Sequence, residues 1–388
     1  MNGWSHYKSI ALQSVQSATG TTETLQSFPA LIACDADAEL ATARADGGDI
    51  RFTRCDGATL LPHWIESWSG GGGSAATMRA WVKVPSIDGT AGATIRVYWG
   101  NPSASSAGDP TAPWDEDFLV VCPGGDGAST AKIDNLLGNV EINKRAADQP
   151  LEVTGLIDRA QQFGATHYAR TANTTTVQSA AWTAEALVRY PSAPSGTYNA
   201  LSAWHLRSVA ATCWGGSRPL LYKGSANYRY WVATAWNTIK DGSWHHVAFI
   251  NPGGAQADIN NAALLVDGAA QAVYSTISSG GVDSTADYNF YLGSAYNTDS
   301  SRSIEALVCQ FHLSKVARSA AWLKYTALNS LAPPWLQTWG PAIHRGAVLR
   351  AAARQCFVAG GEAAAVFAAG AVAAEAFVAG SRAGQVHE

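Results

Sequence analysis

Two acidic residues, Asp115 and Asp117, have a spacing that can bring two carboxylates together. Glycoside hydrolysis uses such a pair, placed on either side of the scissile bond at about 5 to 9 Å from each other. Residues two apart on a strand lie on the same face, so a strand here would point both carboxylates the same way. Both stand at the junction of two predicted domains, and we interpret them as structural residues rather than as a catalytic pair.

The other residue types that support catalysis are isolated. Glu185 and Glu305 stand alone in strand-like segments, which predicts an edge or solvent-facing position for each. His245 and His246 are adjacent, so a strand would point them to opposite faces, where they cannot bind one metal ion. The run Gly70 to Gly73 lacks the Gly-Lys-Ser/Thr of a phosphate-binding loop, and we interpret it as a loop between strands. We identify no catalytic residue and predict that the protein is not an enzyme.

Aromatic residues gather between positions 204 and 236. The cluster comprises Trp204, Trp214, Tyr222, Tyr228, Tyr230, Trp231 and Trp236. On a strand, Tyr228 and Tyr230 share one face and Trp231 lies on the other, and one of these faces must be core. Exposed aromatic rings favour interfaces and can stack on sugar rings. Core packing and ligand binding both stay open. For the second interpretation, the candidate binding residues are Trp204, Trp214, Tyr228, Tyr230 and Trp236.

The cysteines are scattered along the chain. They are Cys34, Cys55, Cys122, Cys213, Cys309 and Cys356. None forms a Cys-x-x-Cys motif, and none has metal-ligand spacing to a pair of histidines. We predict that most are buried free thiols, with a bridge between Cys34 and Cys55 as the alternative, and we predict no metal site.

Composition bounds the function further. Of the 388 residues, 47% are hydrophobic and 14% are charged, a balance that can bury cores of two or three domains. The net charge of -4 argues against a nucleic-acid partner, which needs a concentrated positive field. No apolar run approaches the roughly 18 residues of a membrane-spanning helix. The N-terminal residues lack a basic segment followed by an apolar stretch, so we expect no secretory signal and a protein made in the cytoplasm.

The elements that must position these residues are mostly short strands. Residues 78–84 alternate, with Met78, Ala80, Val82 and Val84 on one face. Residues 104–111 have the composition of a linker. Beyond it, strands are predicted at 184–190, 228–233, 244–250, 263–266 and 289–292, and a short helix at 319–329 with Ser319 as its N-cap. Many strands and few helices predict an all-β fold, with jelly-roll-like β-sandwich domains at residues 1–112 and 113–340.

Residues 341–388 form a tail rich in Ala and Gly. A ten-residue repeat places Phe357, Phe367 and Phe377 in register, each followed three positions later by Gly360, Gly370 or Gly380. Ten is not a helical period, whereas an even period returns each Phe to the same face of a β structure. Such a unit needs stacked neighbours or other chains to bury its residues. We predict a β-type assembly element, with an Ala-rich helix or a loose tail as the alternative.

Residues 4 to about 118 carry an ordered series of family motifs. They are Trp4, Tyr7, and residues 28–31 (FPAL), 45–52 (ADGGDIRF), 60–66 (LLPHWIE), 81–85 (WVKVP), 97–102 (VYWGNP) and 114–118 (WDEDF). This region resembles a bacterial and phage domain of uncharacterised function that commonly precedes laminin-G-like modules. The resemblance implies a β-rich surface module without known chemistry.

The second region carries motifs of another kind. They are residues 155–163 (GLIDRAQQF), 241–248 (DGSWHHVA), 265–268 (LVDG) and 314–323 (SKVARSAAWL). These resemble laminin-G and concanavalin-like domains, which implies a jelly roll that binds glycans or proteins, often with calcium. Relatives often carry an acidic residue before the closing strand, where this chain has residues 304–311 (IEALVCQF). We identify no calcium ligand set and predict no cofactor.

Three functions are consistent with these features. The first is a structural protein of a tailed-phage virion, in the tail tip, fibre or baseplate, that contacts a host-surface glycan or protein. It accounts for the repeat, which predicts a homo-oligomer, most simply a trimer, together with other tail proteins as partners. The second is a bacterial surface glycan-binding protein, and the third is a glycan-cleaving enzyme on the same sandwich. We favour the first, because the second predicts a secretory signal and the third predicts a pair of catalytic acids.

Overall fold

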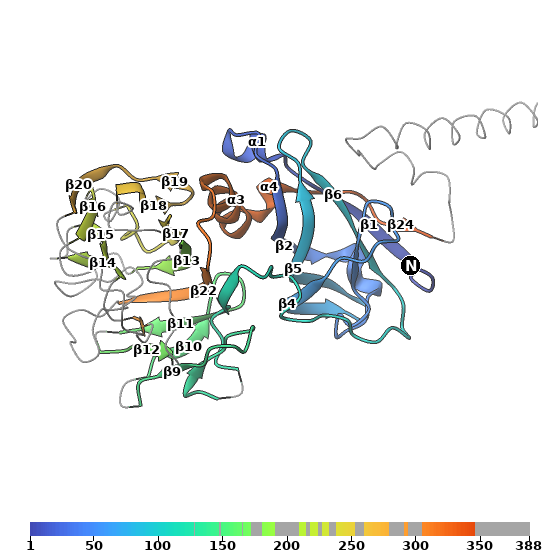
Figure 1. The fold of residues 1–388 in the computed structure, drawn as a ribbon. Coiled ribbons are helices and arrows are strands. Elements are labelled where there is room, and N and C mark those ends of the chain that lie inside the picture. Colours follow the sequence, from blue (N-terminus) through green and yellow to red (C-terminus); the bar gives the residue numbers. More distant parts are fainter. Residues whose placement is uncertain are drawn as a thin grey trace, which may run out of the picture. The chain divides into compact units, whose positions relative to one another are not determined.

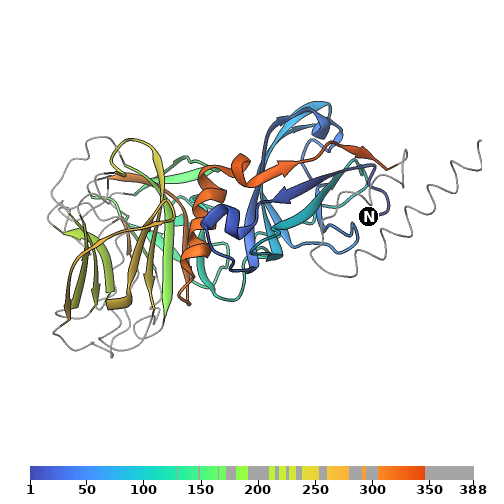
Figure 2. The same ribbon diagram turned by 90° about the horizontal axis from the view of Figure 1, so that it is seen from above.

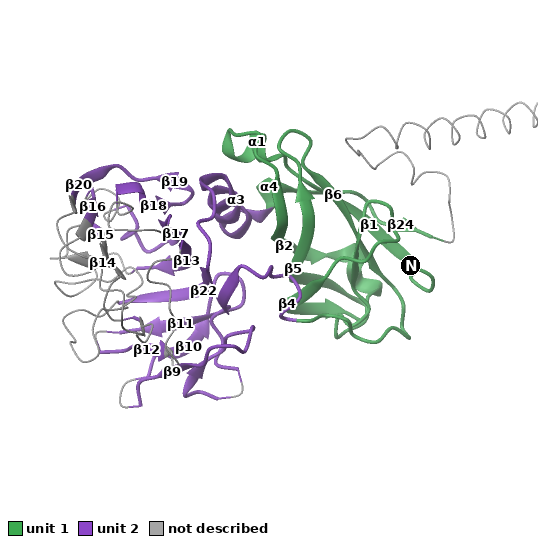
Figure 3. Ribbon diagram, viewed as in Figure 1, with its two compact units in different colours: residues 1–109, 334–388 green, residues 110–333 purple. Residues whose placement is uncertain are grey.

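The protein is described here by a computed structural model, which is drawn in two orientations in Figures 1 and 2. The residues that the structure describes are 1–127, 129–146, 149–164, 166–171, 181–190, 209–214, 218–223, 227–232, 238–252, 260–278, 291–293 and 305–345. They divide into two compact units (Figure 3), residues 1–109 with 334–388 and residues 110–333. The division at 109 falls in the predicted linker. At the other end, residues 334–340, which the sequence boundaries placed in the second domain, belong to the first unit.

The first unit contains two antiparallel sheets. One contains β1 (His6–Leu12), β3 (Arg51–Arg54), β6 (Ala93–Trp99), β23 (Gln337–Trp339) and β24 (Ile343–His344). The other contains β2 (Leu25–Asp37), β4 (His63–Gly71) and β5 (Ser74–Ile87). Three short helices lie between strands: α1 (Val15–Thr19), the 3-10 helix η1 (Ala38–Thr42) and α4 (Pro333–Leu336). The glycine run forms the tight connection between β4 and β5, as predicted.

Strand β5 confirms the alternation read from the sequence. Met78, Ala80, Val82 and Val84 are all buried, as one face of a strand on a core must be. Trp81, on the opposite face, is also buried, and its Nε1 donates a hydrogen bond to Glu66 at 2.6 Å. A buried indole N–H needs such a partner.

Strand β1 is the centre of the first sheet because it pairs on both sides. Along one side it pairs with β6 over its whole length. Along the other it pairs with the C-terminal strands, with Ile10 opposite Trp339 in β23 and His6 opposite His344 in β24. The C-terminal strands β23 and β24 are therefore part of the first unit's sheet.

The second unit is built from one large and two smaller antiparallel sheets. The large sheet contains β7 (Phe118–Cys122), β10 (Leu151–Thr154), β11 (Arg159–Phe163), β13 (Trp182–Arg189), β17 (Trp244–Asn251), β18 (Ala263–Val266), β19 (Ala269–Ala270) and β22 (Ala306–Ser314). The second sheet contains β8 (Lys132–Ile133), β9 (Ile142–Lys144), β12 (Ala169–Thr171) and β21 (Tyr291–Leu292). The third contains β14 (Val209–Trp214), β15 (Arg218–Lys223), β16 (Asn227–Trp231) and β20 (Val273–Ser278). The all-β class and the sandwich architecture predicted from the sequence are confirmed.

The central strands of the large sheet are buried on both faces. Alternate residues of β13, from Trp182 to Tyr190, enter the core shared with the smaller sheets. The residues between them face the other way, toward helix α3 (Ala320–Leu331), which contacts β17. As predicted, Ser319 caps α3, and its side chain accepts a hydrogen bond from the N–H of Trp322 at 3.1 Å. Because both faces of these strands are covered, their polar side chains must find hydrogen-bond partners within the protein.

The described cysteines are free thiols. Cys122 and Cys309 are buried, whereas Cys34 and Cys55 are half-buried and unbridged. The prediction of buried thiols without a disulfide is thus confirmed for Cys122 and Cys309 but not for the half-buried Cys34 and Cys55, and the alternative of a Cys34–Cys55 bridge is wrong. Cys213 and Cys356 have no described side chain.

Candidate ligand-binding site

The predicted aromatic binding face is described only in part. Trp204 and Trp236 lie outside the described residues, and Trp214 and Tyr228 lie on β14 and β16 with side chains outside the description. Tyr230 is half-buried. Trp231 is 1% exposed and packs edge-on against Phe249 with 5.7 Å between ring centroids, so this ring is core. A ligand-binding role for the other aromatic residues stays a prediction.

The repeat residues of the predicted assembly element also fall outside the described part of the chain. They are Phe357, Gly360, Phe367, Gly370, Phe377 and Gly380. Their role in oligomerisation stays a prediction.

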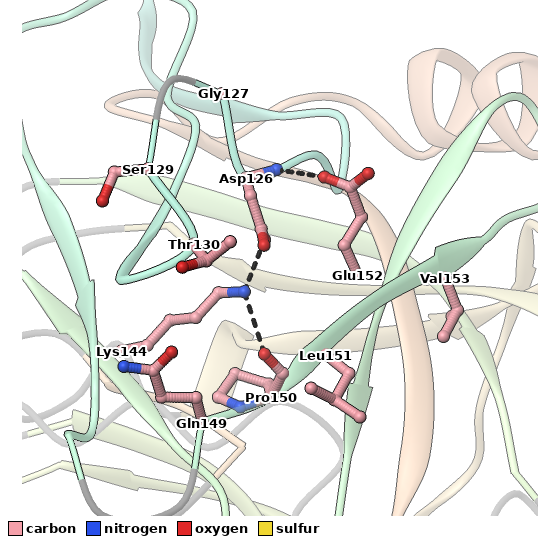
Figure 4. A pocket seen from close by; sticks show the side chains of 10 residues that line it. All are labelled: Asp126, Gly127, Ser129, Thr130, Lys144, Gln149, Pro150, Leu151, Glu152 and Val153. Atoms are coloured by element: carbon pink, nitrogen blue, oxygen red, sulfur yellow. Dashed lines mark hydrogen bonds and ion pairs between the residues drawn. The ribbon is translucent and has the colours of Figure 1, made fainter.

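A hollow of about 550 Å³ lies in the second unit, beside the end of β9 and the edge strand β10 (Figure 4). Its walls are Asp126, Gly127, Ser129, Thr130, Lys144, Gln149, Pro150, Leu151, Glu152 and Val153. Ligand pockets in proteins usually measure about 300 to 1,000 Å³. Polar groups on one side and the apolar Pro150, Leu151 and Val153 on the other give the hollow a mixed lining. A small polar ligand fits both its size and its chemistry.

Lys144 supplies the central cation of this hollow. It stands two residues after the fully buried Ile142 in β9, and its own side chain is only 1% exposed. A buried ammonium group needs partners, and Lys144 forms an ion pair with Asp126 and donates a hydrogen bond to the carbonyl of Pro150 at 2.9 Å (Figure 4). These two contacts fix the position of the amino group at the wall of the hollow.

The two carboxylates of the hollow are fixed in the same way. Asp126 also accepts a hydrogen bond from the side-chain amide of Gln161 at 2.6 Å. Glu152 accepts one from the N–H of Asp126 at 2.6 Å and forms an ion pair with Arg159. Each charged side chain of the lining, Lys144, Asp126 and Glu152, is thus held in an ion pair.

None of these residues was selected from the sequence. The available signal was Lys144 itself, because it follows Val140 and Ile142 on one face of an alternating segment, and a buried lysine demands a carboxylate. Its partners Asp126 and Glu152 come from segments without a recognisable motif. Only folding brings them together.

A second polar cluster is buried in the middle of the large sheet. Glu185 of β13 is 3% exposed, which corrects the expectation of an edge or solvent-facing position. Its carboxylate accepts a hydrogen bond from Nε2 of His246 at 3.0 Å, and His312 lies 3.7 Å from the other carboxylate oxygen. Burial by itself raises the pKa of Glu185, but the two imidazoles outweigh burial and lower the pKa to about 2. This carboxylate is therefore ionised, and it does not have the raised pKa of a general acid.

His245 and His246 point to different partners, as their adjacency predicts. His245 lies between two aspartates, with Nδ1 2.8 Å from Asp267 and Nε2 3.1 Å from Asp241. Hydrogen bonding to Asp267 raises the pKa of His245, burial opposes this, and Asp241 adds to the rise. Within the described residues, no group of three or more His, Cys, Asp or Glu side chains has the arrangement of a metal site.

Asp115 and Asp117 do not share a strand face, so that expectation is wrong. Both precede β7, which begins at Phe118, and the Asp115 side chain accepts a hydrogen bond from the N–H of Asp117 at 3.0 Å in a turn. Asp115 binds the guanidinium of Arg318 through two hydrogen bonds of 2.7 and 3.0 Å. Asp117 lies 3.7 Å from the same guanidinium. Both carboxylates therefore face the same guanidinium, and their structural rather than catalytic role stays a prediction.

Glu305 is half-buried and lines a second hollow, of about 450 Å³, with Arg189 and Tyr190. The Arg189 guanidinium donates a hydrogen bond to the carbonyl of Gly242 at 2.6 Å.

Among the described residues, no helix is long and apolar enough to cross a membrane.

Family comparisons agree with the division into two units. Residues 46–118 match the family model of a domain of unknown function (DUF2341), and residues 163–324 match that of the concanavalin A-like lectin/glucanases superfamily. The order of the two domains is the one expected from the sequence. No curated protein matches the chain.

Solved structures of similar fold are distant. Domain 4 of AbnA, a GH43 extracellular arabinanase from Geobacillus stearothermophilus, in complex with arabinotriose, shares 15% identity over 55% of this chain and 100% of its own, with a TM-score of 0.41. Trypanosoma rangeli sialidase in complex with 2,3-difluorosialic acid shares 14% identity over 61% of this chain and 35% of its own, with a TM-score of 0.37. The binding domain of Paraclostridial Mosquitocidal Protein 1 shares 12% identity over 55% and 52%, with a TM-score of 0.36. We draw no conclusion about ligand or activity from these three.

Proposed function

We propose that this chain, a DUF2341 domain followed by a concanavalin A-like domain, is a non-catalytic binding protein for a cell-surface glycan or protein. The observation that carries this proposal is the match of residues 163–324 to a superfamily of lectins and glucanases. Fold alone does not separate binding from cleavage. The choice between them rests on the carboxylates of the second unit.

Four of these carboxylates support binding rather than hydrolysis, whereas burial raises the pKa of two others, Asp134 and Asp158. A glycosidase needs one carboxylic acid with a raised pKa to protonate the leaving group. Glu185 has instead a pKa lowered to about 2 by its two imidazoles. Asp126, Glu152 and Asp115 are each paired with a cation. These four acids therefore lack the environment of a proton donor.

More specifically, we propose that the protein is a structural component of the tail tip, fibre or baseplate of a tailed-phage virion. The ten-residue repeat supports it, because an Ala- and Gly-rich unit of this kind needs other chains to bury its aromatic residues. A fibre or baseplate protein provides those chains as identical copies and as neighbouring tail proteins. A bacterial surface glycan-binding protein is the alternative, and it does not require the repeat to assemble.

The binding proposal is tested with the purified full-length chain. We expect saturable binding to a glycan array or to intact bacteria. Periodate treatment of the cells, which oxidises sugars, would remove binding to a glycan, and protease treatment would remove binding to a protein. The same glycans are then incubated with the chain and assayed for new reducing ends. Release of reducing sugar at enzymatic rates would overturn the non-catalytic part of the proposal.

A further inference from the structure

We infer that the hollow beside Lys144 is a binding site for an uncharged, hydroxyl-rich ligand, namely one or two sugar units of a neutral glycan (Figure 4). This inference rests on the proposed function and assigns the binding of the glycan to this hollow. The hollow belongs to the second unit, and its lining residues differ from the aromatic residues selected from the sequence. Three properties of its described residues support this ligand class.

The first property is that every charge of the lining is paired. Lys144 is paired with Asp126, and Glu152 is paired with Arg159, which lies outside the lining. A phosphate or carboxylate ligand needs an unpaired cation, and a metal cation needs unpaired carboxylates. An uncharged ligand needs neither. The hydroxyls of Ser129 and Thr130 and the amide of Gln149 add donors and acceptors without charge.

The second property is that the polar groups are already fixed in place. The ammonium group of Lys144 has two protein partners, and Asp126 and Glu152 each have a donor at 2.6 Å in addition to their cation. Lys144 lies at the end of β9, and Glu152 lies within β10. Groups positioned on strands lose little conformational entropy when a ligand binds. Charged groups that are hydrogen-bonded in this way are strong partners for sugar hydroxyls.

The third property is the apolar side of the hollow. Leu151 is 60% exposed, and it lies beside Pro150 (Figure 4). A sugar ring has apolar C–H faces as well as hydroxyls. A wall that combines Leu151 and Pro150 with the polar groups opposite matches both features. A lipid would leave the charged groups of the hollow without partners, at a cost in free energy.

The competing occupant is an extended peptide. β10 is the end strand of the large sheet, and a peptide can add to an open strand edge by backbone hydrogen bonds. We favour the sugar because the polar side chains converge on the hollow rather than along the strand. The experiment distinguishes the two occupants.

The test uses the full-length chain and variants of the hollow. The probes are neutral gluco-, galacto-, manno- and arabino-oligosaccharides, with sialyllactose and inorganic phosphate as anionic probes, titrated by calorimetry. Thr130 is exposed at the wall of the hollow, so Thr130→Trp fills the space while Lys144 and Asp126 themselves are kept. We expect it to weaken binding of the best neutral oligosaccharide by at least about tenfold. Gln149→Ala, which removes one amide and fills nothing, is expected to weaken it severalfold.

Tyr230→Ala is the variant of the competing site, because it alters the predicted aromatic binding face and leaves the lining residues of the hollow unchanged. We expect it to bind the oligosaccharide as the wild type does, and circular dichroism confirms that each variant is folded. If Tyr230→Ala loses binding and the hollow variants do not, the site is overturned and the proposed function stands. Binding of the anionic probes alone, or of an extended peptide in place of every sugar, also overturns the site. If the chain binds no probe and no cell, the proposed function fails together with the site.

Discussion

The carboxylate of Glu185 lies 3.0 Å from Nε2 of His246, in the interior of the second unit. The two residues come from neighbouring strands, since β13 pairs with β17 so that Leu187 is opposite His246 and Glu185 is opposite Ala248. They are therefore diagonal neighbours on one sheet face, within reach of each other's side chains. His312 from β22, on the other side of β13, completes the cluster.

The substitution Glu185→Gln is expected to destabilise the second unit by about 2–3 kcal/mol at neutral pH, because it replaces a charge-assisted, buried hydrogen bond with a neutral amide. The free energy of unfolding from urea titrations measures this. Glu305→Gln is the matched control. Glu305 is half-buried, so the same change of charge is expected to alter the free energy of unfolding by about 0.5 kcal/mol or less. Equal effects of the two variants would contradict the structural role of Glu185.

The same cluster predicts a dependence of stability on pH. The pKa of Glu185 falls from 4.5 to about 2 on folding, so the folded state binds this proton more weakly than the unfolded state. The resulting stabilisation is fully present above about pH 4.5 and is lost as the pH falls toward 2, with a total of about 3 kcal/mol. The measurement is the difference in unfolding free energy between wild type and Glu185→Gln at several pH values. We expect this difference to shrink between pH 4.5 and 2, and a difference that is constant over this range would refute the assignment.

These residues show what the sequence alone can predict. Patterns within one segment were reliable: the buried alternation of Met78 and Val82 in β5, and the N-cap of Ser319 on α3, follow from periodicity and capping. Glu185 was misjudged because its partner His246 is 61 positions away, and no local pattern encodes that pairing.

The same limit applies to the candidate site. Lys144 and Asp126 are 18 positions apart, on segments that share no motif. Asp115 and Asp117 were assigned to a strand because they alternate with Glu116, but the Asp115 side chain instead forms a turn with the N–H of Asp117. Aspartate favours such local hydrogen bonds over a strand ladder. Polar residues with distant partners are therefore the part of this protein that needed a structure.

Arg318→Lys is expected to destabilise the second unit by about 1–3 kcal/mol although the charge is kept. The guanidinium donates two hydrogen bonds to Asp115 and lies 4.3 Å from the ring centroid of Trp322 and 4.8 Å from that of Phe118. An ammonium group cannot reproduce the two parallel hydrogen bonds or the planar stacking. Arg159→Lys is the control, because the Arg159 side chain is 56% exposed and a solvent-exposed ion pair contributes little. Thermal unfolding that shifts equally in both variants would contradict this prediction.

In the first unit, Gly70→Ala is expected to destabilise the β4–β5 hairpin by about 3 kcal/mol. Gly70 has a φ of +97°, and an added Cβ would lie 2.1 Å from the carbonyl oxygen of Ala75. Both the backbone conformation and the contact are unfavourable. Gly73 has a φ of +106° with nothing within 4 Å of the added Cβ, so Gly73→Ala carries only the conformational cost of about 1–2 kcal/mol. Hydrogen exchange of peptides covering residues 63–87 measures the destabilisation in both variants. An equal loss of protection in the two would show that the contact with Ala75 is relieved.

The last prediction concerns the tail. Its removal must spare β24, because His344 pairs with His6 and the N–H of Arg345 donates a hydrogen bond to the carbonyl of Ser5 at 2.8 Å. A chain that ends at Arg345, rather than at the sequence boundary of residue 340, therefore keeps the first unit's sheet complete. We expect light scattering to give three times the 40.7 kDa chain mass for the full-length protein and one chain mass for the truncated one, with unchanged thermal unfolding of the two units.

A full-length control separates the repeat from the length of the tail. Replacing Phe357, Phe367 and Phe377 with Ser keeps the length of the tail and the period of the repeat. It removes the apolar side chains that the repeat places on one face. If those side chains drive assembly, this variant has the mass of one chain, as the truncated protein does. A trimeric triple variant would mean that other residues of the tail associate. A monomeric full-length protein would remove the assembly role of the repeat, and with it the main support for a place in a virion tail.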